Sequence, residues 1–198
     1  MTDYDITAEL TATTRCGFQR YTFPQEKEGS RILIDLQNPA EYGYNLEKVQ
    51  LIKINDQRVE GFSKQISPNT WSGGISQEYI IHFVIEFDQP ITNFGVWTED
   101  GIQKNTVELN ATKCKDAGAY FEFDTKVNPF VQVRTGISYV SIKNAAENLE
   151  KEITQPFAWS FDAVRQNNLD TWNDLFKRLK ITSNDRREKM RFYSNMYR

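Results

Sequence analysis

The side chains that could carry out acid–base or nucleophilic chemistry are few, or are spread widely along this 198-residue chain. Histidine occurs once, as His82, and cysteine twice, as Cys16 and Cys114. A single histidine excludes a histidine-rich metal site and any catalytic triad that needs a histidine elsewhere in the chain. His82 falls on a predicted strand, on the same face as Glu86, and we interpret it as a structural residue with no catalytic role.

Carboxylates are plentiful, but their spacing does not single out a catalytic pair. A glycosidase that inverts configuration uses two carboxyl groups about 6.5–9.5 Å apart, and sequence spacing does not reveal such a separation. Asp116, Asp124 and Asp162 lack the alternating spacing of a calcium-binding loop. The remaining clusters fall in predicted turns or on exposed helix faces, where we expect solvated charge. These clusters are residues 26–28, Glu47, Glu99 with Asp100, and residues 147–152. We therefore assign no catalytic residue and no metal ligand.

Trp71 is the one candidate for substrate binding. It precedes Ser72, Gly73 and Gly74 in a predicted loop, and a tryptophan at a loop edge can stack on a sugar ring. The alternative is that Trp71 closes the end of a hydrophobic core. The two cysteines also leave two interpretations open, because they could form one disulfide across a β-sandwich or remain as two buried free thiols.

Composition excludes several classes of partner. The formal net charge is −3, so no broad positive field would attract the phosphates of a nucleic acid. No apolar run approaches the roughly 20 residues that span a bilayer. The sequence opens on a strand-like pattern without the basic and apolar segments of an export signal. We expect a soluble chain that binds no nucleic acid.

Most of the sequence alternates between apolar and polar residues with a period of two, which predicts β-strands. Residues 4–12 alternate in this way, and the break at Cys16-Gly17 before residues 18–23 predicts a hairpin with one face exposed to water. Further strands are expected at residues 31–36, 48–54, 58–65, 79–87, 93–98, 107–110, 120–123 and 131–139. About ten strands with no helix among them predict a mostly β protein, with an antiparallel β-sandwich over residues 1–141.

The periodicity changes at Ser141, which is a suitable N-cap for a helix. Apolar residues then recur at helical spacing from residue 145 to residue 153. A second helix is predicted over residues 161–179, and a third begins after residue 185 and is still running at the end of the sequence. Residues 142–198 are therefore expected to form a helical extension.

Several segments, in the same order, resemble the N-terminal region of glycoside hydrolase family 92, a family of bacterial α-mannosidases. Residues 5–24, DITAELTATTRCGFQRYTFP, are similar to the family's VTAELTAT.R.GFHRYTFP strand pair, with Gln19 in place of the usual histidine. Residues 82–87 with residues 94–96 resemble its YFVAEFS.PF..FGV stretch. The passage from residue 136 to residue 173 resembles the entry to the family's helical catalytic domain. The final FYSNMYR is similar to its FYTALYH, with Arg198 in place of histidine.

This resemblance implies a fold and an activity. Residues 1–141 would form a galactose-mutarotase-like supersandwich that lacks its first strands, and residues 142–198 would lead into an (α/α)6 catalytic domain. The parent protein would be a calcium-dependent, inverting exo-α-mannosidase of the periplasm or extracellular space. It would act on mannose-containing glycans, commonly at α-1,2 linkages. The family's catalytic carboxylates and calcium ligands lie beyond residue 198, so none is carried over, and no cofactor is expected in this chain.

Two alternatives remain. The chain could be a free-standing carbohydrate-binding or scaffolding module in which Trp71 and nearby aromatic residues form a platform. It could also be an interaction domain. Without a catalytic domain to cover them, Trp172, Phe176, Phe192 and Tyr193 would lose packing surface, and the exposed helices would then drive self-association.

Overall fold

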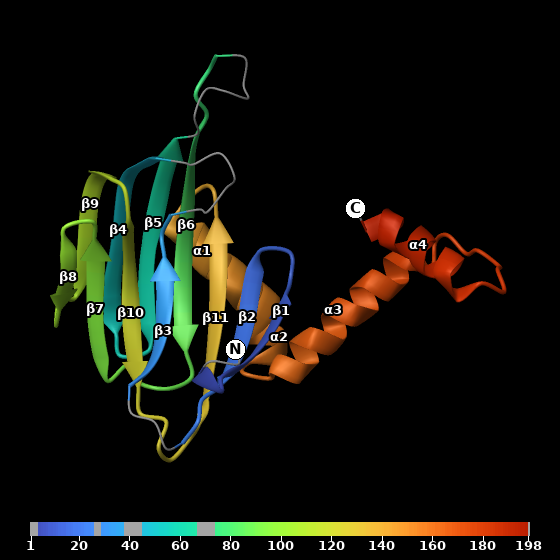
Figure 1. Ribbon diagram of the computed structural model, residues 1–198, viewed down its shortest axis with the longest axis horizontal. Helices are drawn as coiled ribbons and strands as arrows, with labels where there is room; N and C mark the ends of the chain where they lie inside the picture. The colour runs from blue at the N-terminus through green and yellow to red at the C-terminus, as the bar shows by residue number, and fades with distance from the viewer. Residues whose placement is uncertain (1–3, 26–28, 38–44, 67–73, 198) are drawn as a thin grey trace.

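Two antiparallel β-sheets followed by helices make up the chain in the computed structural model, which describes residues 4–25, 29–37, 45–66 and 74–197 (Figure 1). The predicted antiparallel β-sandwich is confirmed. None of the helices in the described ranges has both the length and the apolar character needed to cross a lipid bilayer.

The larger sheet has seven strands within the described residues, in the order β1-β2-β11-β6-β5-β4-β9. Every neighbouring pair is antiparallel. Its strands, from one edge to the other, are β1 (Thr7–Ala12), β2 (Cys16–Thr22), β11 (Phe130–Ser138), β6 (Glu78–Phe87), β5 (Arg58–Ile66), β4 (Asn45–Asn55) and β9 (Glu108–Cys114).

The smaller sheet has four strands in the same described ranges, in the order β3-β10-β7-β8. They are β3 (Ser30–Asp35), β10 (Ala117–Phe123), β7 (Asn93–Thr98) and β8 (Gly101–Lys104). Sequence alternation did not predict β8, because all four of its residues are exposed and no buried face imposes a period of two.

The main hydrophobic core lies between the two sheets. Alternate residues of β6 point into it, and Phe83, Ile85 and Phe87 are all buried there, as the period-two pattern predicts. Phe87 packs against Phe121 and Phe123 of β10, with ring centroids 5.0 and 5.2 Å apart. These aromatic contacts join the two sheets at the centre of the sandwich.

The N-terminal hairpin forms as predicted, but the apolar side of β1 is not buried. Leu10 is 70% exposed and Tyr4 60%. Strand β1 is an edge of the larger sheet, and the inter-sheet core includes no residue of β1 among those that the structure describes. The alternation therefore predicts the strand correctly, although the smaller sheet does not cover it.

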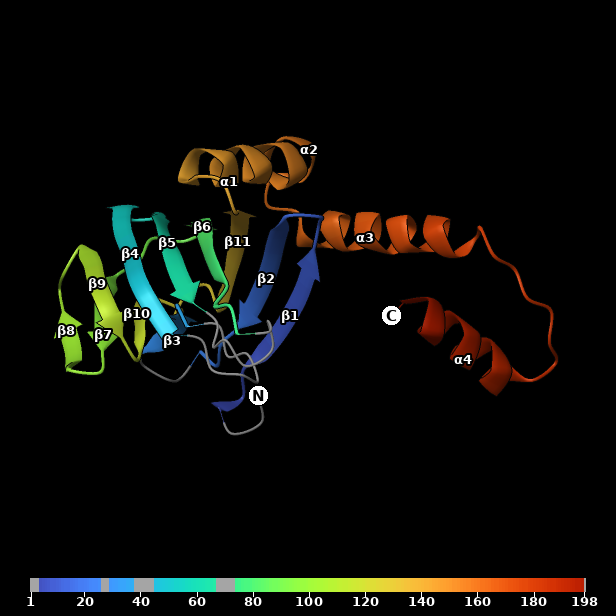
Figure 2. The same cartoon turned by 90° about the horizontal axis from the view of Figure 1, so that it is seen from above.

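Helices α1 and α2 lie on the side of the larger sheet that faces away from the core (Figure 2). Helix α1 (Ile142–Leu149) begins at the predicted N-cap, where Ser141 Oγ accepts a hydrogen bond from Asn144 N at 3.1 Å. A π-helical segment, η2 (Glu150–Thr154), and a short helix, α2 (Gln155–Phe157), continue from it. Helix α3 (Phe161–Phe176) then projects past the edge formed by β1 and β2, and α4 (Arg186–Tyr197) follows it.

A second hydrophobic cluster joins these helices to the larger sheet. The sheet contributes Cys16, Phe18 and Val84, and the helices contribute Ala145, Leu149, Ile153, Phe161 and Val164. Helix α1 lies so close to β11 that a Cβ atom on Gly136 would overlap the carbonyl oxygen of Ala145. The larger sheet is therefore buried on both faces along its central strands.

Candidate functional site

The residues that the sequence singled out for chemistry do not converge on one site. Trp71, the substrate-binding candidate, lies outside the described residues, as do residues 26–28. Asp162 pairs with Arg20, Asp116 Oδ1 accepts a hydrogen bond from the Trp97 indole, and Asp124 Oδ1 accepts one from a backbone amide. Within the ranges that the structure covers, no three His, Cys, Asp or Glu side chains gather closely enough to hold a metal ion.

His82 and the two cysteines occupy structural positions. His82 Nδ1 lies 3.2 Å from the carbonyl oxygen of Ser138 on the neighbouring strand, and its ring contacts Phe62. Cys16 and Cys114 are both buried as free thiols. They belong to different hydrophobic clusters on opposite faces of the larger sheet, which excludes a disulfide between them. Burial raises the pKa of the Cys16 thiol to about 12, so it is not an activated nucleophile.

Asp88 is a partly buried carboxyl group, and burial raises its pKa, the direction that a general acid needs. Its oxygens accept hydrogen bonds from Gln132 N at 2.8 Å and Gln132 Nε2 at 3.2 Å. These bonds fasten the chain just after β6 to the neighbouring strand β11. We therefore assign Asp88 a structural role.

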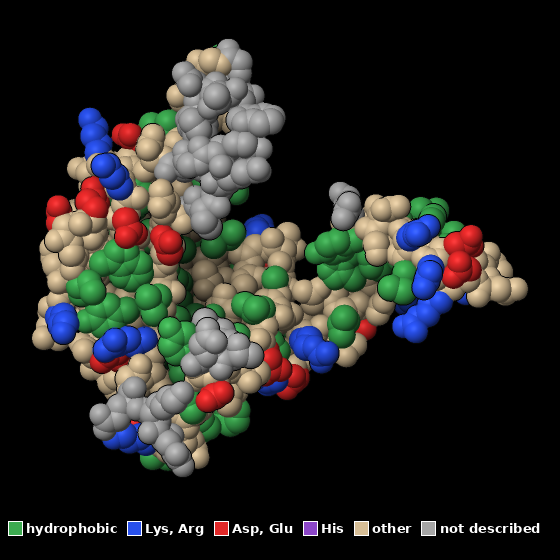
Figure 3. All heavy atoms as spheres, in the orientation of Figure 1, with side chains coloured by type: hydrophobic (Ala, Val, Ile, Leu, Met, Phe, Trp, Pro, Cys, Tyr) green, Lys and Arg blue, Asp and Glu red, His purple; other side chains and the backbone are tan. Residues whose placement is uncertain are grey.

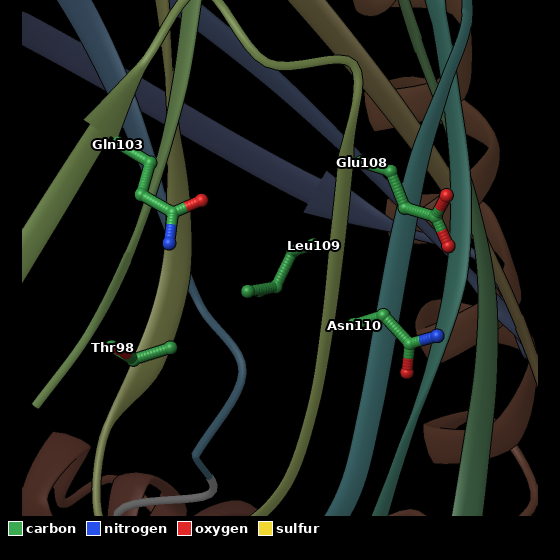
Figure 4. A pocket seen from close by; sticks show the side chains of 5 residues that line it. All are labelled: Thr98, Gln103, Glu108, Leu109 and Asn110. Carbon is green, nitrogen blue, oxygen red and sulfur yellow. The ribbon is translucent and has the colours of Figure 1, made fainter. Parts of the chain in front are cut away.

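A cavity of about 340 Å³ opens between the edges of the two sheets and is lined by Thr98, Gln103, Glu108, Leu109 and Asn110 (Figure 4). Leu109 points toward Thr98 and Gln103, whereas Glu108 and Asn110 point away from them. The Glu108 carboxylate instead accepts a hydrogen bond from Gln50 Nε2 at 3.2 Å. The cavity is thus an open edge of the sandwich without an acid–base pair directed into it.

The outer face of the smaller sheet carries two aromatic rings that lie over glycines. Trp97 of β7 covers Gly118 of β10, and Tyr120 of β10 covers Gly95 of β7, so a Cβ atom on either glycine would overlap the ring. Trp97 Nε1 donates to the Asp116 carboxylate at 3.0 Å. The indole is therefore held flat against the sheet.

Apolar and charged side chains surround the two rings. Leu33 is the cross-strand partner of Tyr120, and Ile102 is the cross-strand partner of Trp97. Both lie on the same face as the rings and are 64% and 66% exposed, respectively. The Arg31 guanidinium lies 5.5 Å from the centre of the Tyr120 ring. Figure 3 shows hydrophobic side chains gathered on this face, with charged side chains around them. A partly exposed indole held in this way is a surface on which the apolar face of a sugar ring can stack.

Charged side chains make several of the polar contacts that fix the helices to the larger sheet, and the first of these contacts centres on Glu152. Its side chain is only 13% exposed and accepts hydrogen bonds from Thr13 Oγ1 at 2.6 Å, Arg15 N at 2.9 Å and Arg15 Nε at 2.6 Å. Burial raises the pKa of this carboxyl, but the bonds from Thr13 and Arg15 outweigh burial and leave the pKa below its usual value. The prediction that residues 147–152 carry only solvated charge is therefore wrong at Glu152.

The second contact joins the N-terminal hairpin to the start of α3. Arg20 of β2 donates to both carboxylate oxygens of Glu9, at 2.7 and 2.9 Å, and to Asp162 Oδ2 at 3.1 Å. Its guanidinium carbon lies 4.5 Å from the centre of the Phe161 ring. The hydrogen bonds from Arg20 lower the pKa of the Glu9 carboxyl. One arginine thus contacts β1 and the first two residues of α3.

The third contact centres on Arg134 of β11, which is buried with only 8% of the residue exposed. Arg134 Nε donates to Glu86 Oε2 at 2.8 Å, and Arg134 Nη1 donates to the carbonyl oxygen of Ala158 at 3.1 Å. Its guanidinium also lies 4.0 Å from the centre of the Trp159 ring. These contacts leave no local pattern in the sequence, because the partners of Arg134 are far away in the chain.

Comparison with family models divides the chain at the junction between sheet and helices. A model of the glycosyl hydrolase family 92 N-terminal domain matches residues 1–138. A model of the glycosyl hydrolase family 92 catalytic domain matches residues 144–198. A search of curated proteins gave no match.

Solved structures with this fold include two mannosidases from Bacteroides thetaiotaomicron. The family GH92 inverting mannosidase BT2199 superimposes with a TM-score of 0.78 at 22% identity, over 97% of this chain and 24% of its own. The family GH92 α-mannosidase BT3965 gives 0.78 at 24% identity, over 99% of this chain and 25% of its own. BT3965 has also been solved in complex with mannoimidazole. The chain therefore spans about a quarter of the length of these structures.

The buried contacts of Glu152 predict a pH-dependent loss of stability on replacement. A carboxyl whose pKa is lower in the folded state stabilises the fold above its unfolded pKa and loses this effect as pH falls through its folded pKa. We expect Glu152→Gln to lower the free energy of unfolding by about 1–3 kcal/mol at neutral pH, since hydrogen bonds to a charged group are lost. The deficit should shrink as pH falls below the ordinary glutamate range of about 4.3.

Urea denaturation at several pH values measures this difference, and Glu150→Gln is the matched control because Glu150 is exposed on the same helical segment. The control should behave like the parent chain throughout. An equal loss of stability in both variants, or a Glu152→Gln deficit that does not change with pH, would contradict the assignment.

Proposed function

Because the chain belongs to glycosyl hydrolase family 92, we propose that it is the N-terminal β-sandwich, with the helices that lead into the catalytic domain, of a calcium-dependent inverting exo-α-mannosidase. The proposed substrates are mannose-containing glycans, with α-1,2 linkages as the expected preference. The observation that carries the proposal is the order of the two family matches, with the sandwich at residues 1–138 and the catalytic domain beginning at residue 144. The proposed location of the whole protein is the periplasm or the extracellular space.

We further propose that this part of the protein does not hydrolyse glycosides by itself. Inversion needs a general acid and a general base about 6.5–9.5 Å apart, with room for water between them. The cavity beside Leu109 has no such pair directed into it, since Glu108 and Asn110 point away from Leu109. The acid, the base and the calcium ligands would come from the rest of the catalytic domain, where a bound calcium ion would help to distort the terminal sugar.

The role proposed for the described residues is to support that domain. Helix α3 exposes Leu169, Trp172 and Leu175, and α4 exposes Met190 and Tyr197. We propose that this surface packs against the remainder of the catalytic domain. In the chain alone, the same surface would favour self-association.

An activity assay tests the proposal. The chain alone, with calcium added, is expected to leave an aryl α-mannoside intact. The product of the native gene extended downstream through the catalytic domain should hydrolyse it, release β-mannose as the first product by proton NMR, and lose activity on chelation of calcium. Hydrolysis by the 198-residue chain, or an extended protein that releases α-mannose first, would overturn this assignment.

A second candidate function is carbohydrate binding by the sandwich itself. The observation in its favour is Trp97, whose indole is held flat on an outward-facing surface by Gly118 and Asp116. Neighbouring Leu33 and Ile102 extend the apolar surface around this indole. This surface lies on the smaller sheet, opposite the helices, and so would bind a glycan away from the proposed catalytic site.

Calorimetry with mannose oligosaccharides tests this second function. If Trp97 stacks on a sugar ring, Trp97→Ala should weaken binding at least about tenfold, which corresponds to about 1.4 kcal/mol. Trp172→Ala, a matched replacement on α3, should leave the affinity unchanged. A flat titration of the parent chain, or equal effects of the two replacements, would remove this function from consideration.

A further inference from the structure

The connection between α2 and α3 contains a backbone conformation that suits glycine but is occupied by alanine. Ala158 has φ 49° and ψ −122°. Residues with a Cβ atom rarely adopt this combination, because the side chain clashes with the neighbouring backbone. Such a conformation persists only where surrounding contacts hold it.

Those contacts come from both sides of Ala158. Its N–H donates to the carbonyl oxygen of Thr154 at 3.0 Å, which closes the end of the preceding helix. Its own carbonyl oxygen accepts from Arg134 Nη1 at 3.1 Å. The next residue, Trp159, lies with its ring 4.0 Å from the same guanidinium and packs against Phe18. One arginine therefore holds two consecutive residues of the turn.

Arg134 is itself held by a row of charged side chains across the larger sheet. Glu86 on β6 pairs with Arg134 at 2.7 Å and with Arg58 on β5 at 2.9 Å. Arg58 also pairs with Glu60 at 2.6 Å. Arg134 and Arg58 are each the direct cross-strand partner of Glu86. The strand register thus fixes the position from which Arg134 reaches the turn.

The direction of α3 is set within a few residues of this turn. Phe161, the first residue of α3, packs edge-on against Phe18 with ring centroids 5.5 Å apart. Asp162 pairs with Arg20, and Asn168 Nδ2 donates to the carbonyl oxygen of Ala12 at 2.7 Å. Helix α3 projects past the β1 edge of the larger sheet (Figure 2). A change of angle at the turn would therefore displace the far end of α3 most.

We infer that Arg134 is a positioning residue that clamps the Ala158–Trp159 turn in its strained conformation and thereby sets the angle at which α3 leaves the β-sandwich. This inference rests on the proposed function only in its consequence, because α3 would be the first long helix of the catalytic domain. In the whole protein, the clamp would fix the orientation of that domain relative to the sandwich.

Distance measurements between two spin labels test the clamp in this chain. Bio-orthogonal spin labels are placed at Lys104 on β8 and Asn173 on α3, which are both exposed. The distance between them, measured by pulsed electron paramagnetic resonance, reports the direction of the helix. The parent chain should give one narrow distance distribution. Arg134→Met should broaden or shift it, because the turn loses its hydrogen bond and the stacked guanidinium. Ala158→Gly should stay narrow with an unchanged mean, since it relieves the strain and leaves the clamp in place.

Arg58→Met is the matched control, because it breaks ion pairs with Glu86 and Glu60 without touching the turn. It should lower stability but leave the distance distribution narrow. If Arg134→Met lowers stability and leaves the distribution like that of Arg58→Met, the positioning role is overturned. Should Arg134→Met fail to fold by circular dichroism, Arg134→Lys takes its place. Lysine keeps the charge beside Glu86 but lacks the planar fork that both stacks and donates, so broadening is again expected and an unchanged distribution again contradicts the role.

These distances need no substrate and no calcium. A chain that proves unrelated to mannoside hydrolysis would still show the clamp, and a chain without the clamp would still be open to the activity assay. Failure of the inference and failure of the proposed function are therefore distinguishable.

Discussion

The arrangement depends on the packing of helix α1 against the outer face of the larger sheet. Gly136 permits this approach, since a side chain there would overlap the helix backbone. Leu149 and Ile153 then pack against Val84 and Phe18 and are almost completely buried. Because these sheet residues alternate with side chains that fill the inter-sheet core, the central strands are buried on both faces. Helix α1 and the segment that follows it therefore form a third layer on the outer face of the larger sheet.

The apolar and polar contacts at this interface have different consequences. Burial of Phe18, Leu149, Ile153 and Phe161 stabilises the contact, at about 1.5–3 kcal/mol for each large apolar side chain relative to its exposed state. The apolar cluster alone does not specify direction, because hydrophobic contacts are non-directional. Hydrogen bonds from Arg134, Arg20 and the partners of Glu152 are directional and join specific donor and acceptor atoms. Replacing a largely buried ion pair such as Arg134–Glu86 by apolar residues is often tolerated for stability, so directionality is what this pair adds to the apolar cluster.

Sequence patterns predicted the parts of this fold whose determinants are local. Alternation in β6 gave both the strand and the face that is buried, and Ser141 marked the first helix correctly. Strand β8 was missed because none of its residues is buried, so no pattern records it. Leu10 follows the alternation but remains exposed, because nothing in a strand's own sequence says whether a second layer will cover it. Trp71, the one predicted site residue, lies outside the described residues and stays a prediction.

The interface contacts were not predictable, because they join residues that are distant in sequence. In the sequence, Glu152 is indistinguishable from the other charged residues of its helical segment. Its partners, Thr13 and Arg15, lie 139 and 137 positions away. The residues alone predict a change of period near Ser141. Resemblance to a family added the expectation that this change marks a junction between two domains, and the two family matches meet between residues 138 and 144. The structure adds that the helices after Ser141 pack on the larger sheet through an apolar cluster. Ion pairs also join these helices to the N-terminal hairpin of the sheet.

Native-state hydrogen exchange tests most directly the claim that the helices and the sandwich form one cooperative unit. If they do, the amides of α1 and of the central strands β6 and β11 should exchange with the same free energy of opening, because separating the helix would expose the outer face of the sheet. Exchange in α1 at a free energy several kcal/mol below that of β6 and β11 would show that the sandwich is stable without its helices, and would contradict this account.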